Sequence, residues 1–216
     1  MNWISILEDF SIWIILLPAF TGLIVFRRLD KDSRIIFVVV LLACIPQVLK
    51  SFMDGTSLLT AAYNIYTPLE FIVYWILFRQ KIISTHRKTI LDAMAIVFAI
   101  VSVYLIYRYN IRSRFINEWV VLNNIFQVSW IGLCLLEFYY SDESIINSSQ
   151  PFFWFLIAIT GYASCTAVFF SLWHFIRNNS EAQFSIVNAI HHIFNILLYV
   201  FFTIGFLKNC KLKDHP

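Results

Sequence analysis

Seven apolar stretches separated by short polar intervals constrain this chain more than any other feature of its sequence. They cover residues 6–26, 35–52, 58–78, 90–109, 119–140, 152–175 and 184–207. Each is close to the roughly 20 residues that an α-helix needs to cross about 30 Å of hydrocarbon. We therefore predict an all-α polytopic membrane protein, in which residues 1–216 form a single domain of seven transmembrane helices.

The composition agrees with this prediction and leaves little chain for anything else. Hydrophobic residues make up 60% of the chain and charged residues 13%, whereas a soluble domain has about 25% charged residues. The longest polar intervals, residues 79–89 and 141–151, have the length of loops. A signalling output that needs a folded aqueous domain must then come from a separate protein.

The distribution of Lys and Arg between alternate loops predicts the orientation of the helices. Eleven basic residues fall on the side that holds the first, third and fifth loops and the C-terminal tail: Arg27, Arg28, Lys31, Arg34, Arg79, Lys81, Arg87, Lys88, Lys208, Lys211 and Lys213. Five fall on the other side: Lys50, Arg108, Arg112, Arg114 and Arg177. Because cytoplasmic loops are enriched in basic residues, we predict an outside N-terminus and a cytoplasmic C-terminus. The net charge of +3 is explained by these helix ends, and we expect no nucleic-acid partner.

Polar residues recur at helical spacing within the third, fifth and seventh apolar stretches. The stripes consist of Tyr63, Thr67, Glu70 and Tyr74; of Asn123, Gln127, Trp130, Cys134 and Glu137; and of Asn188, His192, Asn195 and Tyr199. Such spacing places each set on one face of its helix. Polar residues at bilayer depth are costly and often functional, so the stripes predict a polar layer in the outer half of the bundle.

We expect eight residues of this layer to bind a small ligand. They are Asn64, Thr67, Glu70, Asn123, Gln127, His191, His192 and Asn195. An alternative for the amide side chains is hydrogen bonding between helices, which is common in membranes. Glu70 differs, because a lone buried carboxylate costs several kcal/mol unless it is protonated or paired, and His191 or His192 is its expected partner.

The sequence predicts no metal, cofactor or catalytic residue. His191 and His192 are adjacent, so their side chains point about 100° apart on a helix. Zinc-dependent seven-helix hydrolases use an HxxxH pair, and the positions one turn away are here Asn188 and Asn195. Retinal binding is not expected, because the last apolar stretch has no Lys before Lys208.

Two stretches resemble known membrane protein groups. Residues 45–51, which contain Pro46-Gln47, are followed by Gly55-Thr56-Ser57 and resemble the PQ-loop motif of seven-helix sugar and amino-acid transporters. That family has the dipeptide in its first and fifth helices, whereas here it stands in the second and the fifth offers only Phe126-Gln127. Residues 63–71 and 28–34 are similar to a group of uncharacterised small seven-helix bacterial membrane proteins. This resemblance implies a location in the bacterial inner (plasma) membrane and transfers no site residues.

The leading functional hypothesis is a sensor or receptor-like module. It would bind a small ligand in an outward-facing polar cavity and signal through a separate protein, with membrane lipids as its other partners. The alternatives are a small-solute transporter, which the PQ-like fragment would suit, and a membrane-embedded enzyme that acts on a lipidic substrate.

Overall fold

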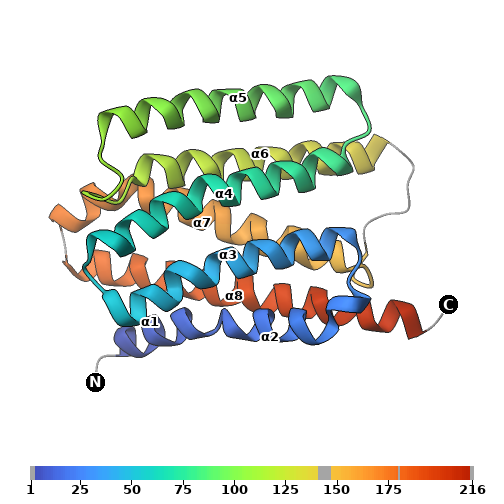
Figure 1. Cartoon of the computed structure of the whole chain (residues 1–216), viewed down its shortest axis with the longest axis horizontal. Helices are drawn as coiled ribbons and strands as arrows, with labels where there is room; N and C mark the ends of the chain where they lie inside the picture. Colours follow the sequence, from blue (N-terminus) through green and yellow to red (C-terminus); the bar gives the residue numbers. More distant parts are fainter. Residues whose placement is uncertain (1–2, 141–146, 180, 215–216) are drawn as a thin grey trace.

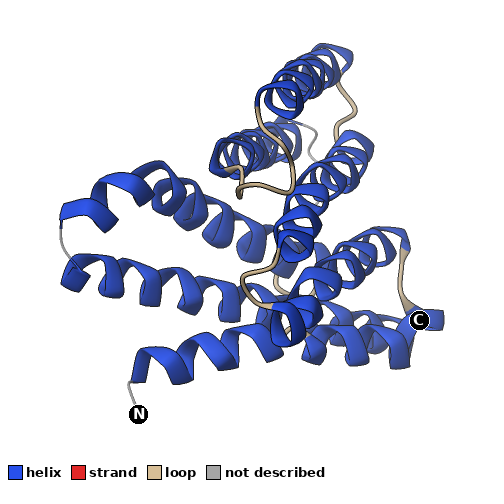
Figure 2. Cartoon of the chain, turned by 60° about the vertical axis from the view of Figure 1, so that its left-hand side comes forward, coloured by secondary structure: helices blue, strands red, loops and turns tan. Residues whose placement is uncertain are grey.

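The computed structural model describes residues 3–140, 147–179 and 181–214, and over these residues the chain is helical without a strand (Figures 1 and 2). The elements are α1 (Trp3–Trp13), α2 (Leu16–Val25), the short 3-10 helix η1 (Phe26–Arg28), α3 (Lys31–Met53), α4 (Ser57–Lys81), α5 (Thr85–Arg108), α6 (Asn117–Tyr140), α7 (Pro151–Asn179) and α8 (Glu181–Asp214). Each predicted apolar stretch lies on one of these helices, with α1, α2 and η1 forming the first.

Six helical segments of the described chain are long and apolar enough to cross a membrane. They are Trp3–Arg28, Lys31–Met53, Thr85–Arg108, Asn117–Tyr140, Pro151–Trp173 and Gln183–Asn209. The chain is therefore an integral membrane protein in contact with lipid. The seventh predicted span, α4, has 25 residues but is less apolar, because it carries Asn64 and the polar stripe. Asn64, Thr67, Glu70 and Tyr74 of this helix are buried in the protein interior.

Local sequence explains where several helices start and break. The Asp30 side chain accepts a hydrogen bond from the amide of Ser33 at the start of α3 (2.8 Å). The first span is interrupted four residues before Pro18, where the proline ring would clash with the Ile14 carbonyl. That carbonyl instead accepts from the amide of Leu17 (3.0 Å). Pro46 and Pro68, by contrast, lie inside the continuous helices α3 and α4.

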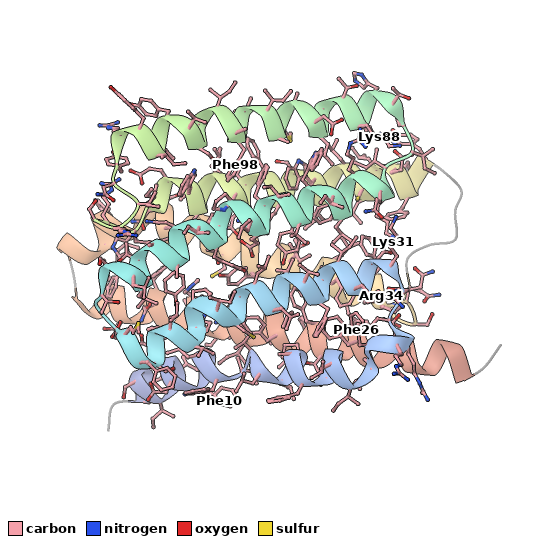
Figure 3. The ribbon with its side chains drawn as sticks, viewed as in Figure 1. Phe10, Phe26, Lys31, Arg34, Lys88 and Phe98 are labelled. Carbon is pink, nitrogen blue, oxygen red and sulfur yellow. The ribbon has the colours of Figure 1, made fainter. Side chains whose placement is uncertain are left out.

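The helices close into a ring around the centre of the molecule. α2 packs against α3, α3 against α4, α4 against α6, α6 against α7, and α7 against α8, which returns to α1 and α2. α5 lies outside the ring, at the edge of the molecule in Figure 1, and packs only against α4 and α6 among the stronger contacts. Phe98 of α5 points toward these helices (Figure 3) and stacks on Phe71 of α4, with the ring centroids 3.7 Å apart.

Large aromatic side chains fill the ring at the end near the C-terminus. The Phe155 ring contacts those of Phe202 and Phe206 at centroid distances of 5.8 and 5.6 Å, and all three are buried. α8 comes this close to α7 because Gly205 lacks a Cβ, which would lie 2.3 Å from the Phe155 ring. The aromatic plug, defined here as Phe37, Phe155, Phe202 and Phe206, closes this end of the bundle.

Basic side chains gather at the same end as the plug. Lys31, Arg34 and Lys88 are grouped there in Figure 3, at the end of the molecule that also holds the C-terminus. The opposite end of the bundle holds the N-terminus and the α3–α4 turn (Figure 1). That end also holds Lys50, Arg108, Arg112 and Arg114, so basic residues are present at both ends but are more numerous at the end with the plug.

Candidate functional site: a polar cavity in the bundle

A cavity of about 670 Å³ opens at the end of the bundle opposite the aromatic plug, with walls from α1, α3, α4, α6, α7 and α8. Its mouth is bordered by Asp54 of the α3–α4 turn and Arg114 of the α5–α6 loop, both exposed. Its inner part is lined by buried or half-buried side chains that include Ala43, Tyr66 and Tyr199. The cavity is thus enclosed by helices that are far apart in the sequence.

Glu70 lies in the inner part of this cavity and is bound by neutral donors. Its side chain is 7% exposed. One carboxylate oxygen accepts from the Tyr66 hydroxyl and the other from Asn123 Nδ2, each at 2.8 Å. Gln127 Nε2 donates in turn to Asn123 Oδ1 (3.0 Å). The expectation that His191 or His192 pairs with Glu70 was wrong.

The two histidines belong instead to the contacts of α8 with α1 and α7. His192 Nδ1 lies 2.8 Å from the hydroxyl of Ser11 on α1, and the acid near His192 is Glu8. His191 stacks on Phe169 of α7, with centroids 4.7 Å apart and planes 5° apart. Because α8 packs mainly against α7, α1 and α2, its polar stripe faces that of α4 across the cavity and does not lie beside it.

Six of the eight predicted ligand-binding residues line the cavity: Thr67, Glu70, Asn123, His191, His192 and Asn195. Asn195 also donates to the Ser11 carbonyl (3.2 Å), which joins α8 to α1. Gln127 lies behind Asn123 and orients it. A ligand-binding role for these residues stays a prediction.

Asn64, the eighth predicted residue, is turned away from the cavity and holds the α5–α6 loop. Its Nδ2 donates to the carbonyls of Ile111 and Arg114, at 2.7 and 2.8 Å, and its Oδ1 accepts from the amide of Ile116 at 3.0 Å. These bonds use the whole amide group, which is 1% exposed. Asn64 therefore acts on the cavity indirectly, by positioning a loop at its mouth.

Sequence reasoning missed an ion pair in the cavity wall. Lys50 Nζ of α3 lies 2.9 Å from Glu8 Oε1 of α1, and both residues line the cavity together with Ser11. A signal was present, since an acid in the first apolar stretch and a base at the end of the second fall near the same end of the bundle. Tyr63, whose hydroxyl donates to Gln47 Oε1 (3.4 Å), adds a further contact between α4 and α3.

The described residues contain no group of three or more His, Cys, Asp or Glu side chains that could hold a metal ion. No family model, curated protein or solved structure matches the chain. The cavity and its chemistry are therefore the basis for a functional proposal.

Proposed function

We propose that this chain is a seven-helix receptor-like module that binds a small ligand in the cavity and passes a conformational change to a separate protein. The observation that supports it is the cavity of about 670 Å³, lined by polar groups from six helices. This volume lies within the range of about 300–1,000 Å³ found for ligand pockets. The aromatic plug beyond it favours a receptor over an open channel.

The proposal places the mouth of the cavity on the outer side of a bacterial inner membrane, with all seven helices spanning it. The support is the charge asymmetry, because the end opposite the cavity holds basic residues at the starts of α3 and α5 and at the end of α4. Cytoplasmic loops are enriched in such residues. They would also offer a basic surface to the signalling partner.

The orientation predicts the outcome of reporter fusions at the C-terminus. A fluorescent protein fused after Pro216 should fluoresce, and alkaline phosphatase at the same position should be inactive, because the C-terminus is expected in the cytoplasm. Phosphatase fused after Gly55, in the α3–α4 turn, should be active and serves as the matched control. An active phosphatase after Pro216 would reverse the proposed orientation.

A small-solute transporter is the second candidate, and one observation favours it. Pro46 and Gln47, the dipeptide that resembles the PQ-loop motif, both line the cavity. A proline inside a helix removes a backbone hydrogen bond and allows a bend, which is the kind of position at which α3 could move. Transport would require the aromatic plug to open.

Filling the cavity should abolish ligand binding without unfolding the protein. Thr67 and Thr60 lie on α4, and each hydroxyl donates to the carbonyl four residues earlier, but only Thr67 lines the cavity. We expect Thr67→Phe to remove the thermal stabilisation that a library of amines, amino acids and sugars produces in the purified protein, and Thr60→Phe to retain it. A ligand at 100 times its Kd should raise the free energy of unfolding of the protein by roughly 2.7 kcal/mol.

The purified protein and its Thr67→Phe variant also distinguish a receptor from a transporter. Proteoliposomes should show no uptake of the stabilising compound if the chain is a receptor, whereas uptake that Thr67→Phe abolishes would establish the transporter. A library without any stabilising compound, or stabilisation that Thr67→Phe leaves intact, would contradict a binding function for this cavity.

A further inference from the structure

The charges that line the cavity do not balance once the ion pairs are assigned. Three acids and two bases line it: Glu8, Asp54, Glu70, Lys50 and Arg114. Lys50 pairs with Glu8, and Arg114 pairs with Glu118 at 2.5 Å. Asp54 and Glu70 have no ion-pair partner within the part of the chain that the structure describes. The cavity is thus left with acidic groups at its mouth and in its inner part.

An unused acceptor lies on the same wall as the inner acid. Asn124, next to the Asn123 that donates to Glu70, lines the cavity and is 2% exposed. Its Nδ2 donates to the Val120 carbonyl (2.7 Å), but its Oδ1 has no hydrogen-bond partner among the residues that the structure describes. A buried oxygen without a donor is destabilising, so this atom indicates that a donor is supplied from the cavity.

Aromatic rings provide part of the remaining surface. Tyr66, Tyr162 and Tyr199 lie in the walls, as do Phe169, Phe170 and Trp173. Ring faces attract cations through their quadrupole. Acids without a basic partner, an unused carbonyl oxygen and aromatic walls are together the surroundings that an organic ammonium group requires.

We infer that the ligand of this cavity is a small organic cation with a primary ammonium group, which pairs with Glu70 and donates to Asn124 Oδ1. The inference rests on the proposed function and names the ligand class of the same site. A bare metal ion fits less well, because a cavity of about 670 Å³ far exceeds an ion, and the described residues hold no group of three or more His, Cys, Asp or Glu side chains that could bind one. The Glu70 carboxylate has room for the ligand, since each oxygen can accept a second hydrogen bond.

Three probes of one shape test the inference by isothermal titration. The purified chain in phosphatidylcholine nanodiscs is titrated with 2-phenylethylammonium, 2-phenylethanol and phenylacetate, with empty nanodiscs as the blank for partitioning into lipid. We expect the ammonium compound to bind at least about tenfold more tightly than the alcohol, a difference of about 1.4 kcal/mol. Phenylacetate should bind most weakly, because its carboxylate faces Glu70.

Variants then test whether Glu70 causes the preference for the ammonium compound. Glu70→Gln should remove the preference, so that the ammonium compound and the alcohol bind with similar affinity. Asp92→Asn is the matched control, because Asp92 pairs with Arg79 away from the cavity, and it should retain the preference. If Glu70→Gln does not fold, the comparison of the three probes on the unaltered protein decides.

Three results would overturn the inference. Equal binding of the ammonium compound and the alcohol, or a preference that survives in Glu70→Gln, would show that Glu70 does not select a cation. Failure of the ammonium compound to bind at all would do the same. Binding of the alcohol or phenylacetate that Thr67→Phe abolishes would still support the proposed function, so the failures of the two proposals are distinguishable.

Discussion

Replacement of Arg87 by methionine is expected to lower the free energy of unfolding by about 3–5 kcal/mol, because it leaves a buried carboxylate without its counter-ion. The carboxylate is that of Glu137 on α6, which is 5% exposed. Arg87 Nη1 lies 2.7 Å from one oxygen, and the amide of Ser84 donates to the other at 3.1 Å. The pair joins the start of α5 to the end of α6, and the backbone amides of Ser84 and Ile83 that bind Glu137 would not compensate the charge.

The matched control is Arg79→Met, which breaks an exposed ion pair. Arg79 lies 3.0 Å from Asp92, and their side chains are 47% and 33% exposed. Such pairs contribute about 0–1 kcal/mol, so this variant should lose little stability. Both variants can be compared by unfolding in mixed detergent micelles with increasing SDS.

A double substitution tests whether the unpaired Glu137 carboxylate causes the loss of stability in Arg87→Met. Arg87→Met with Glu137→Leu removes both charges, and we expect it to recover most of the stability that Arg87→Met loses, because an apolar pair of similar volume often replaces a buried ion pair at little cost. Equal losses in Arg87→Met and Arg79→Met, or no recovery in the double variant, would show that the Glu137 carboxylate is not dependent on Arg87.

Replacement of Asn64 by leucine should have the next largest effect. It leaves the carbonyls of Ile111 and Arg114 and the amide of Ile116 without their partner. Each buried group that loses its hydrogen bond costs about 1–3 kcal/mol, so we expect a loss of at least about 2 kcal/mol and a loosened α5–α6 loop. Hydrogen exchange of the loop amides should accelerate, most of all at Ile116.

Thr67→Val is the control for this prediction. Thr67 is also buried on α4, but its hydroxyl donates only to the Tyr63 carbonyl of its own helix (3.2 Å). Thr67→Val should therefore lower the free energy of unfolding only slightly and leave the hydrogen exchange of the loop amides unchanged. If Asn64→Leu is no more destabilised than Thr67→Val, Asn64 does not hold the loop.

The extent of the helices and the inward face of α4 could both be predicted from the sequence. The apolar stretch 58–78 lies within Ser57–Lys81, and Thr67, Glu70 and Tyr74 are all buried as their spacing indicates. In lipid, a helix satisfies its backbone hydrogen bonds within one segment, so its limits depend on nearby residues. The period of its polar residues likewise identifies the inner face from that segment alone.

The partners of these inward residues could not be predicted. Glu70 and His192 face the same cavity, and the sequence suggested that they would pair, yet Glu70 binds Tyr66 and Asn123 and His192 lies against Ser11. The choice depends on which helices are neighbours. That order places α4 beside α6 and α8 beside α1 and α7.

The sequence by itself therefore determined that this is a helical membrane protein, where its helices lie along the chain, and which face of α4 turns inward. Only the tertiary structure decided that the helices close into a ring, that a cavity forms at one end, and that Glu70 has no basic partner among the described residues. The physical reason is the range of the interactions. Hydropathy and periodicity are properties of consecutive residues, whereas the cavity depends on packing between helices as distant in sequence as α1 and α8.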